Sequence, residues 1–436
     1  MPIGVATKYY ERIALAEAVA PAADVPPSAA FDFESLQKTG LLARLAPKAL
    51  TLVLDALWAC RIVFPRPRIP FSRYVVVMRH ADVVAVLSDN ERFETPFGRE
   101  MRQLCSGDDF ILGVGDPEHA VQLSAIKAAM PPTDLPRLAR LCEHQAATLI
   151  SAAPGRIDVI GDLFRRVAIE VFATYFGVPV ADPEAFGDWT MALNNLLFAD
   201  PTGGPPARAQ ALAAAARVRL ILDSAIAAAR IAPDSKTIIG RLVRLTNPAL
   251  TDGQIRAIVL GLATGFVPTI TLASSNILSL LMRRPKWMAA AQAAASLQDR
   301  GPLKAILLEA ARLNPALQPG QWRYTLADAR IGPKDGLLSR RVRLGDVIIV
   351  ATKYALRDPR RFPDPMQMKP GRNPPPDIMF GTGMHWCLGT FVALTEMTEV
   401  FRLLLQQPNL RRAAGPAGAL STVGPYPRHL ELEFGP

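Results

Sequence analysis

Apolar residues recur at helical spacing over most of the chain. Stretches with Ala and Leu on one face at 135–153 and 160–176 predict amphipathic helices, and an Ala-rich stretch at 208–230 predicts another. A run with three prolines and two glycines at 200–206 separates the last of these from a helix predicted at 183–197. The pattern indicates a mainly α-helical protein.

The longest apolar stretch begins at Thr251 and ends near Arg284. Thr251 and Gln254 have the spacing of a capping box, which predicts the start of a helix. At ~1.5 Å per residue this helix would be about 50 Å long, enough to cross a whole domain. It has no Asp or Glu within 253–298, and its internal proline, Pro268, removes one helix hydrogen bond and is expected to bend it.

Strand patterns are short and few. A β-branched run at 74–78 precedes an amphipathic helix at 79–87, and further strands are expected within 342–350 and at 430–434. Residues 94–112 follow neither period and are expected to form a loop. The predictions add a small β-rich part to the helical body.

Composition restricts the partners. The chain has 436 residues, with 49 Lys and Arg against 39 Asp and Glu, a formal net charge of +10. A basic surface can attract nucleic acid, an anionic membrane or an acidic protein, but no nucleic-acid motif accompanies it, so we expect no nucleic-acid partner. The four cysteines have no paired spacing, which favours a reducing compartment: Cys60, Cys105, Cys142 and Cys387.

The N-terminal residues look different from the rest. Residues 1–47 are expected to form an extension with an Ala/Pro-rich linker, followed by one domain over 48–436. Charges within the first twelve residues argue against a signal peptide. The apolar stretch 50–64 carries two charges and is too short to span a bilayer. It could lie on a membrane surface or pack on the body; we favour packing and expect a cytoplasmic protein.

The most restrictive motif is Phe-Gly-Thr-Gly-Met-His-Trp-Cys-Leu-Gly at 380–389. It predicts a glycine-rich loop that presents Cys387 at the start of a helical run ending near Gln406. A thiolate there would face free backbone N–H groups and the positive end of the helix dipole, which stabilise its charge. The glycines let the backbone lie flat against a planar partner. A zinc site is excluded, since two further ligands are missing nearby.

This loop resembles the haem-binding loop of the cytochrome P450 family. The resemblance implies that Cys387 is the axial thiolate of a b-type haem and that His385 bonds a haem propionate. It also implies a single, triangular, mainly α domain with a small β-rich subdomain, the haem lying between the central helix and the cysteine loop. The matching residues are Phe380, Gly381, Gly383, His385, Cys387 and Gly389.

A second motif supports the resemblance. Glu309 and Arg312 stand at i and i+3 on a predicted helix, a spacing that is common and uninformative by itself. Its place before the cysteine loop resembles the structural Glu-x-x-Arg pair of the family. The resemblance implies that Arg372, in the segment between the two motifs, locks onto this pair.

Two more residues resemble haem-propionate ligands, namely His119 and Arg323. In the family a later Arg usually accompanies the first of them. Here Val121 and Leu123 fill those positions, so only His119 carries over from that helix.

The middle of the central helix resembles the oxygen-binding kink of the family, where an acid precedes a threonine. Thr269 matches the alcohol, but Pro268 stands in the place of the acid. Gly265 and Thr264 precede them in the expected groove. We therefore take these four residues as the catalytic candidates, with water on the hydroxyls and freed carbonyls as the proton relay.

The resemblance implies a monooxygenase that inserts one oxygen atom from O2 into a small apolar organic substrate. Because the chain has no flavin or iron–sulfur signature, a separate acidic ferredoxin or flavodoxin-type reductase would supply the electrons. A basic cluster near the cysteine loop could steer that partner: Arg357, Arg360, Arg361 and Lys369.

The missing acid leaves alternatives open. Peroxide carries its own protons, so a peroxide-driven peroxygenase or a hydroperoxide isomerase is the second hypothesis. A non-catalytic haem-binding protein is a distant third. No Arg or Lys occurs between Ile258 and Met282, which weighs against a fatty-acid peroxygenase with a carboxylate anchor on this helix.

The predicted substrate contacts describe a largely apolar pocket. They come from the segment around 94–112, the end of the helix at 183–197, the central helix and a turn expected at 421–427. The candidates are Phe97, Phe110, Leu197, Phe266, Val267, Thr422 and Val423.

Overall fold

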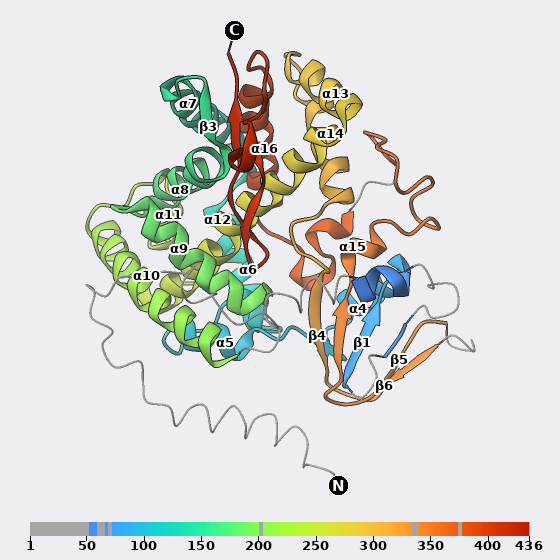
Figure 1. Ribbon diagram of the computed structural model, residues 1–436. Coiled ribbons are helices and arrows are strands. Elements are labelled where there is room, and N and C mark those ends of the chain that lie inside the picture. Colours follow the sequence, from blue (N-terminus) through green and yellow to red (C-terminus); the bar gives the residue numbers. More distant parts are fainter. Residues whose placement is uncertain are drawn as a thin grey trace.

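Helices make up most of the molecule, and the larger sheet lies at one side of it (Figure 1). The computed structural model describes residues 52–58, 66–68, 72–199, 204–333, 339–373 and 377–435. The predicted extension at 1–47 lies outside these residues. The main helices are α4 (His80–Leu87), α5 (Gly98–Leu104), α6 (Glu118–Ala129), α7 (Leu135–Ala152), α8 (Arg166–Val171), α9 (Pro183–Asn194), α10 (Pro205–Ile231), α11 (Ile238–Leu242), α12 (Asp252–Met282), α13 (Pro285–Ala295), α14 (Gly301–Leu313), α15 (Thr352–Ala355) and α16 (Thr390–Leu405).

The predicted helix at 160–176 is present but is not a uniform α-helix. Two π-helical segments, η3 (Val159–Arg165) and η4 (Phe172–Gly177), flank α8. A third, η5 (Asn195–Ala199), continues α9. The helix at 208–230 is confirmed and begins slightly earlier, at Pro205, because a proline fits the first turn.

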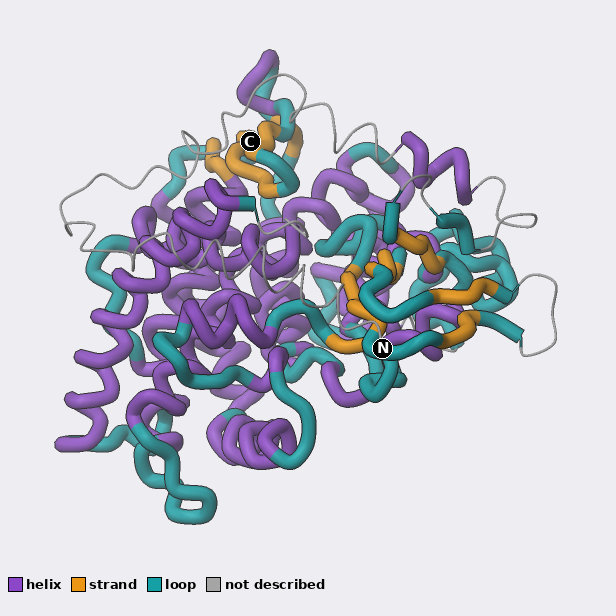
Figure 2. The backbone as a smooth tube through the Cα atoms, turned by 90° about the horizontal axis from the view of Figure 1, so that it is seen from below, coloured by secondary structure: helices purple, strands orange, loops and turns teal. Residues whose placement is uncertain are grey.

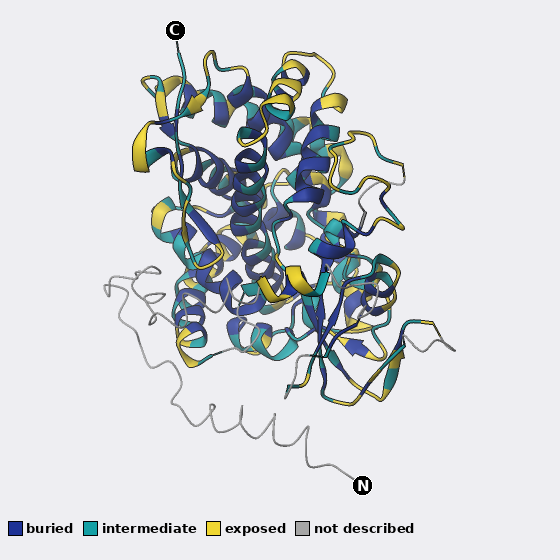
Figure 3. Cartoon of the chain, turned by 45° about the vertical axis from the view of Figure 1, so that its right-hand side comes forward, coloured by how far each residue is buried: buried dark blue, intermediate teal, exposed yellow. Residues whose placement is uncertain are grey.

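The central helix α12 forms the axis of the core (Figure 3). Its N-terminus has the predicted capping box between Thr251 and Gln254, and Pro268 lies inside the helix. Helices α9 and α10 pack along it. In the described part of the chain, α12 alone is long and apolar enough to cross a membrane, but 78% of its most apolar stretch is buried, so it is a core helix.

The larger sheet has four strands in the order β1-β7-β4-β2. Figure 2 shows most of the strands gathered on one side of the helices. The predicted strand β1 (Tyr74–Val77) pairs in parallel with β7 (Val347–Val350), with Val75 opposite Ile348. The central position of β7 explains its unbroken β-branched sequence, because both faces are covered. On its other side β7 pairs antiparallel with β4 (Gln321–Thr325), which pairs antiparallel with the edge strand β2 (Phe93–Glu94).

The described residues form three smaller sheets, two of which lie on the helical body rather than beside the larger sheet (Figure 1). The strand predicted at 430–434 is present as β11 (Glu431–Glu433), paired with β3 (Arg156–Asp158) and β8 (Arg411–Arg412). The turn expected at 421–427 is a hairpin. Its strands are β9 (Ser421–Val423) and β10 (Tyr426–His429). The third small sheet pairs β5 (Ala329–Ile331) with β6 (Arg340–Val342).

The loop expected at 94–112 is wrong in its middle. Helix α5 occupies Gly98–Leu104, and a short 3₁₀ turn follows at Ile111–Gly113. Met101 and Leu104 stand at i and i+3 and are both buried, which fixes the helix although its exposed residues show no clear period.

Part of the apolar stretch 50–64 is described, and it packs on the body. Residues 52–58 are helical, and the side chain of Leu54 is 2% exposed. The Trp58 ring lies 5.7 Å from the Tyr354 ring, and the Tyr354 hydroxyl donates to Asp55 at 2.7 Å. These contacts agree with the packing that the sequence favoured.

The Glu309 carboxylate joins helix α14 to the segment before the cysteine loop. Arg312 donates to both of its oxygens at 2.8 Å, and Arg372 donates to Oε1 at 2.6 Å. The backbone N–H of Lys369 adds a bond of 3.0 Å. Arg312 has no exposed surface and also donates to the Leu356 carbonyl, so three distant segments meet at one buried carboxylate.

Removing this carboxylate should destabilise the protein strongly. In Glu309→Ala the buried Arg312 loses its counter-charge, and we expect a loss of about 3–5 kcal/mol in the free energy of unfolding. Thermal or denaturant unfolding of the haem-loaded protein measures it. Arg341→Ala, which breaks the exposed ion pair with Asp328, is the control and should change little. Equal effects of the two variants would contradict the structural role.

The same carboxylate makes stability depend on pH. Burial alone would raise the pKa of Glu309, but the hydrogen bonds from Arg312, Arg372 and the Lys369 N–H lower it below its ordinary value of 4.5. The stabilisation is therefore complete above that value and is lost as pH falls through the lower pKa of the folded state. We expect the difference in melting temperature between wild type and Glu309→Ala to narrow from about pH 6 to about pH 3. A constant difference would contradict this.

Candidate functional site

The cysteine loop is closed by backbone hydrogen bonds. The N–H of Cys387 donates to the Phe380 carbonyl at 2.9 Å, and the N–H of Trp386 donates to Gly383 at 3.2 Å. The sequence had suggested that the helix begins at Cys387. Helix α16 begins at Thr390 instead, so Cys387 lies just before it. Gly389 is the N-cap residue of α16, and the Thr390 hydroxyl donates to the Cys387 carbonyl at 2.8 Å.

Hydrogen-bond donors surround the Cys387 sulfur. Burial raises the pKa of the Cys387 thiol, and the nearby N–H groups of Gly389 and Thr390 offset this only in part. The Thr390 hydroxyl donates to the Cys387 carbonyl at 2.8 Å. A side chain at Gly389 would place its Cβ 3.8 Å from the sulfur. The Cys387 residue nevertheless has exposed surface. The sulfur thus has N–H groups nearby that can stabilise a thiolate, and its residue is open to a ligand.

Gly383 anchors the loop on helix α4. Its φ is +71°, and a Cβ there would lie 3.0 Å from Ser88 Cα and 3.1 Å from the Leu87 carbonyl oxygen. Only glycine fits both the left-handed backbone and the close approach to α4.

Two histidines and one arginine converge beside this loop. The rings of His119 from α6 and His385 from the loop lie 5.4 Å apart, edge to face. Desolvation lowers the pKa of His385 to about 3, and the charge of Arg323 contributes. Desolvation also lowers the pKa of His119, against the opposing effects of Asp116 and the Met384 backbone.

Arg323 is a buried cation that has no carboxylate partner in the described residues. It is 1% exposed, and its hydrogen bonds go to the Trp322 carbonyl at 2.8 Å and to Gln321 at 3.4 Å. Burial lowers its pKa to about 10. Its Nε and the Nδ1 of His385 are buried and unpaired in the same part of the structure. A buried charge requires compensation, so the cluster fits an anionic ligand such as a carboxylate.

One face of α12 is less buried than the others. Its partly exposed positions recur every three or four residues, and a side chain at Gly265 would meet no atom within 4 Å. Thr269 lies one turn further on this face, and its hydroxyl donates to the carbonyl oxygens of Gly265 and Phe266. The positions are Leu262, Gly265, Thr269, Ala273 and Asn276.

Comparison with known proteins agrees with this geometry. The family model described as Cytochrome P450 matches residues 238–412. Erythromycin C-12 hydroxylase of Saccharopolyspora erythraea is 29% identical over 333 residues, covering 74% of this chain and 80% of that protein. Cytochrome P450 monooxygenase PikC of Streptomyces venezuelae is 27% identical, covering 68% and 67%. The open cytochrome P450 EryK of S. erythraea superposes with a TM-score of 0.72 at 25% identity, covering 88% of this chain and 96% of that one.

The chain belongs to the cytochrome P450 family. It is an oxidoreductase with haem b as its cofactor. The mainly helical fold with a small β-rich part, expected from the cysteine loop, is confirmed. One shorter match differs in kind: 82 residues are 42% identical to a bifunctional dioxygenase–epoxy alcohol synthase of Pyricularia oryzae, covering 19% of this chain and 7% of that protein.

The structure divides the four catalytic candidates of this P450 between two faces of α12. Gly265 and Thr269 lie on the partly exposed face. Thr264 and Pro268 are buried on the face toward α9 and β10. The Thr264 hydroxyl donates to the Leu260 carbonyl at 2.8 Å, which leaves Thr269 as the better placed alcohol.

The predicted substrate contacts of the P450 do not form one group. The ring centroids of Phe266 and Phe176 lie 5.5 Å apart, and Val267 is 1% exposed and lines a small pocket together with Pro268. The substrate-contact role of both residues stays a prediction. The Phe110 ring fills the space at Gly261 of α12.

The remaining predicted contacts come from two other elements. Phe97 packs against Phe198, with ring centroids 5.1 Å apart and the ring planes tilted by 58°, next to the buried Leu197. Thr422 and Val423 lie in the β9–β10 hairpin, the first exposed and the second half-buried.

Two polar residues near Pro268 escaped the sequence analysis. Asn194 and Tyr426 are 1% and 2% exposed and are hydrogen-bonded to each other. Their partners lie far away in the sequence, so no motif marks them. The only available signal was an Asn inside an apolar helix, where a polar side chain needs a buried partner.

Replacing Gly383 should disturb the cysteine loop more than an ordinary left-handed glycine would. We expect Gly383→Ala to lower the melting temperature more than Gly107→Ala, because both have positive φ but a Cβ at Gly107 meets no atom within 4 Å. Unfolding of the haem-loaded variants measures the difference. Similar losses in both would show that the contact with α4 is unimportant.

Proposed function

We propose that this P450 inserts one oxygen atom from O2 into a small apolar organic substrate, using electrons from a separate protein. The observation that carries the proposal is the combination at the cysteine loop. One loop carries both Cys387 and His385. Cys387 is accessible and has backbone N–H groups near its sulfur, and His385 lies close enough to the buried cation Arg323 for that charge to lower its pKa. The named relatives support this reaction class, since erythromycin C-12 hydroxylase and PikC are named as a hydroxylase and a monooxygenase.

The residues present fit a haem. We assign Cys387 as the ligand of the iron, and Arg323, His119 and His385 as the partners of the propionates, because this cluster is buried and short of anions. Phe380, Gly381 and Gly389 form the loop that would lie against the ring. When bound, haem supplies the iron at which oxygen is activated.

Thr269 is the proton-handling residue in this proposal. Its hydroxyl donates to the Gly265 carbonyl, so its lone pairs can accept a hydrogen bond from water. The carbonyl does not take up a proton, so in the relay the hydroxyl turns away from it, gives its own proton to the acceptor and takes one from water. Pro268 can neither ionise nor donate an N–H. The protons must therefore come from water rather than from an acid in α12, which has no Asp or Glu after Asp252.

The proposed electron donor is an acidic ferredoxin or flavodoxin-type protein, in a cytoplasmic setting. The basic cluster is weaker than its sequence suggests. Lys369 pairs with Asp364 at 2.5 Å, and Arg357 is partly buried and donates to the Leu313 carbonyl. Arg360 is exposed, 3.9 Å from Asp358. An exposed aromatic pair beside Cys387, Trp386 and Phe391 with ring centroids 6.0 Å apart, adds apolar contact area for a partner.

A second candidate is a reaction that starts from a peroxide, including rearrangement of an organic hydroperoxide. Two observations favour it: α12 lacks an acid beside Thr269, and part of the chain is 42% identical to a protein named as an epoxy alcohol synthase. Peroxide arrives already reduced and protonated, so neither a reductase nor a relay acid is needed.

Two ways of driving the haem-loaded protein separate these reactions. One uses NAD(P)H, a surrogate ferredoxin system and O2; the other uses hydrogen peroxide or an organic hydroperoxide alone, with the same panel of apolar substrates. We expect oxygenated product in the first. Product only in the second, with reductant merely consumed in the first, would replace the monooxygenase proposal by the peroxide reaction.

Thr269→Ala tests the relay. We expect product per electron consumed to fall several-fold, with hydrogen peroxide released instead, because water near the iron loses its hydrogen-bond partner. The hydroxyl contacts backbone atoms of its own helix, so haem content and melting temperature should change little. Thr398→Val, which removes a similar buried bond in α16, is the control. Unchanged product per electron in Thr269→Ala would rule out Thr269 as a proton carrier.

Electron transfer should respond to salt if charge steers the partner. We expect the rate of haem reduction by an acidic ferredoxin to fall as ionic strength rises, because screening weakens attraction between exposed charges. Arg360→Glu should reduce the rate at low salt and reduce its salt dependence. A rate independent of salt would contradict the steering.

A further inference from the structure

Pro268 leaves a specific carbonyl group without its helical donor. In an α-helix the N–H of residue i donates to the carbonyl of residue i−4, and proline has no N–H. The carbonyl that loses its partner at Pro268 is that of Thr264. Thr264 is 1% exposed, so solvent does not replace the missing bond.

Asn194 supplies the missing bond. It is the last residue of α9, and its Nδ2 donates to the Thr264 carbonyl at 2.9 Å. Because a carbonyl can only accept, the amide nitrogen must point at Thr264 and the amide oxygen must point away. The Tyr426 hydroxyl of β10 donates to that oxygen at 2.7 Å and thereby fixes the orientation of the amide. Burial raises the pKa of Tyr426, so this hydroxyl keeps its proton.

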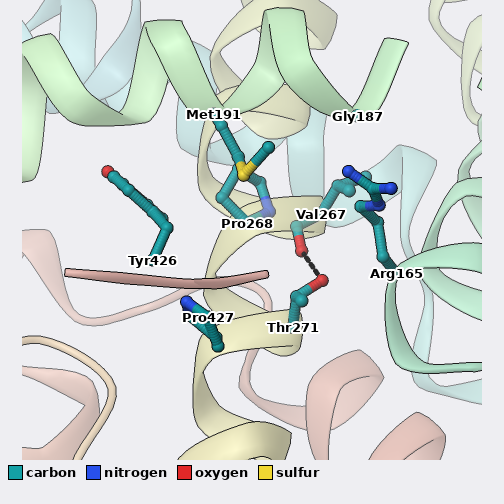
Figure 4. A pocket seen from close by; sticks show the side chains of 8 residues that line it. All are labelled: Arg165, Gly187, Met191, Val267, Pro268, Thr271, Tyr426 and Pro427. Atoms are coloured by element: carbon teal, nitrogen blue, oxygen red, sulfur yellow. Dashed lines mark hydrogen bonds between the residues drawn. The ribbon is translucent and has the colours of Figure 1, made fainter. Parts of the chain in front are cut away.

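The packing beside the proline is not complete. A cavity of about 10 Å³, the size of about one water molecule, lies next to it (Figure 4). Met191 of α9 and Pro427 of β10 line this cavity together with Pro268 and Thr271. The hydrogen bond from Asn194 to Thr264 therefore adds a directed contact from α9 to a turn whose packing leaves a small space.

The neighbouring carbonyls are occupied from within α12. The Thr271 hydroxyl donates to Val267 at 2.8 Å, and the Thr269 hydroxyl donates to Gly265 and Phe266. Among the carbonyls of this turn, Thr264 is the one that receives a side-chain donor from another helix. The turn is the one that carries Gly265 and Thr269 on the partly exposed face.

We propose that Asn194 and Tyr426 are positioning residues, which replace the hydrogen bond withdrawn by Pro268 and so hold Gly265 and Thr269 in place for the reaction. The catalytic part rests on the proposed function, whereas the hydrogen-bond replacement does not. The two parts call for separate measurements.

A double-mutant cycle tests the replacement. Pro268→Ala restores an N–H that can reach the Thr264 carbonyl, so Asn194 should matter less in that background. In the haem-loaded protein, Asn194→Leu should speed amide hydrogen exchange within 259–272 by roughly tenfold or more, as expected for one lost buried hydrogen bond. In the Pro268→Ala background the same change should have little effect. Equal effects in both backgrounds would overturn the proposal, whether or not the protein turns over any substrate.

Thr190→Val is the matched control. Thr190 lies one turn before Asn194 in α9, is fully buried, and donates to the Gly187 carbonyl of its own helix at 2.9 Å. Its loss should leave exchange in 259–272 unchanged. Tyr426→Phe keeps the ring but frees the amide oxygen of Asn194, and it should act in the same direction as Asn194→Leu with a smaller size.

The catalytic part is measured as product per oxidant consumed, under whichever oxidant supports the wild type. Asn194→Leu should lower this ratio several-fold while haem content stays constant, and Pro268→Ala should remove most of the difference. If the effect of Asn194→Leu on amide exchange depends on Pro268 but product per oxidant stays unchanged, the positioning role is overturned. Absence of product from the wild type under both oxidants would instead refute the proposed function, and the exchange cycle alone would then decide the inference.

Discussion

A buried charge requires an opposite charge, and two arginines of this P450 meet that requirement in different ways. Arg312 and Arg323 are 0% and 1% exposed. Arg312 finds its carboxylate in Glu309, which also receives Arg372, so its compensation is complete within the protein. Arg323 has only carbonyl and amide oxygens in the described residues. The first arginine therefore stabilises the fold, while the second is left for an anionic ligand, the role proposed above for the haem propionates.

Each of the two arginines also belongs to a cluster that contacts the cysteine loop or the segment before it. The Glu309 cluster holds the segment that leads into the loop, through Arg372 and the Lys369 N–H. The Arg323 cluster meets the loop at His385. The loop itself is short and is closed by two backbone hydrogen bonds, from Cys387 to Phe380 and from Trp386 to Gly383. Its position therefore depends on these neighbouring clusters and on the close contact of Gly383 with α4. Placement of the sulfur is thus a property of several distant segments.

Sequence reasoning succeeded where one local pattern decides the structure. The capping box at Thr251 and the β-branched run in β1 each depend on neighbouring residues, and both are present. It failed where a distant contact decides. Helix α5, expected as loop, is fixed by two buried side chains that meet the core. Asn194 could not be found, since its importance comes from a carbonyl 70 residues away.

The proline in α12 changes what the rest of the molecule must supply. An acid at that place would bring both a proton and an N–H; Pro268 brings neither. The structural loss is local, one carbonyl, and a donor from α9 replaces it at 2.9 Å. The chemical loss cannot be replaced in the same way, because Asn194 has no ionisable group and faces the buried side of the helix. Water at Thr269, or an oxidant that carries its own protons, must therefore make up the difference. Pro268 therefore has its missing hydrogen bond replaced by Asn194, while the acid that it lacks is not replaced, and this lack bears on which oxidant the enzyme uses.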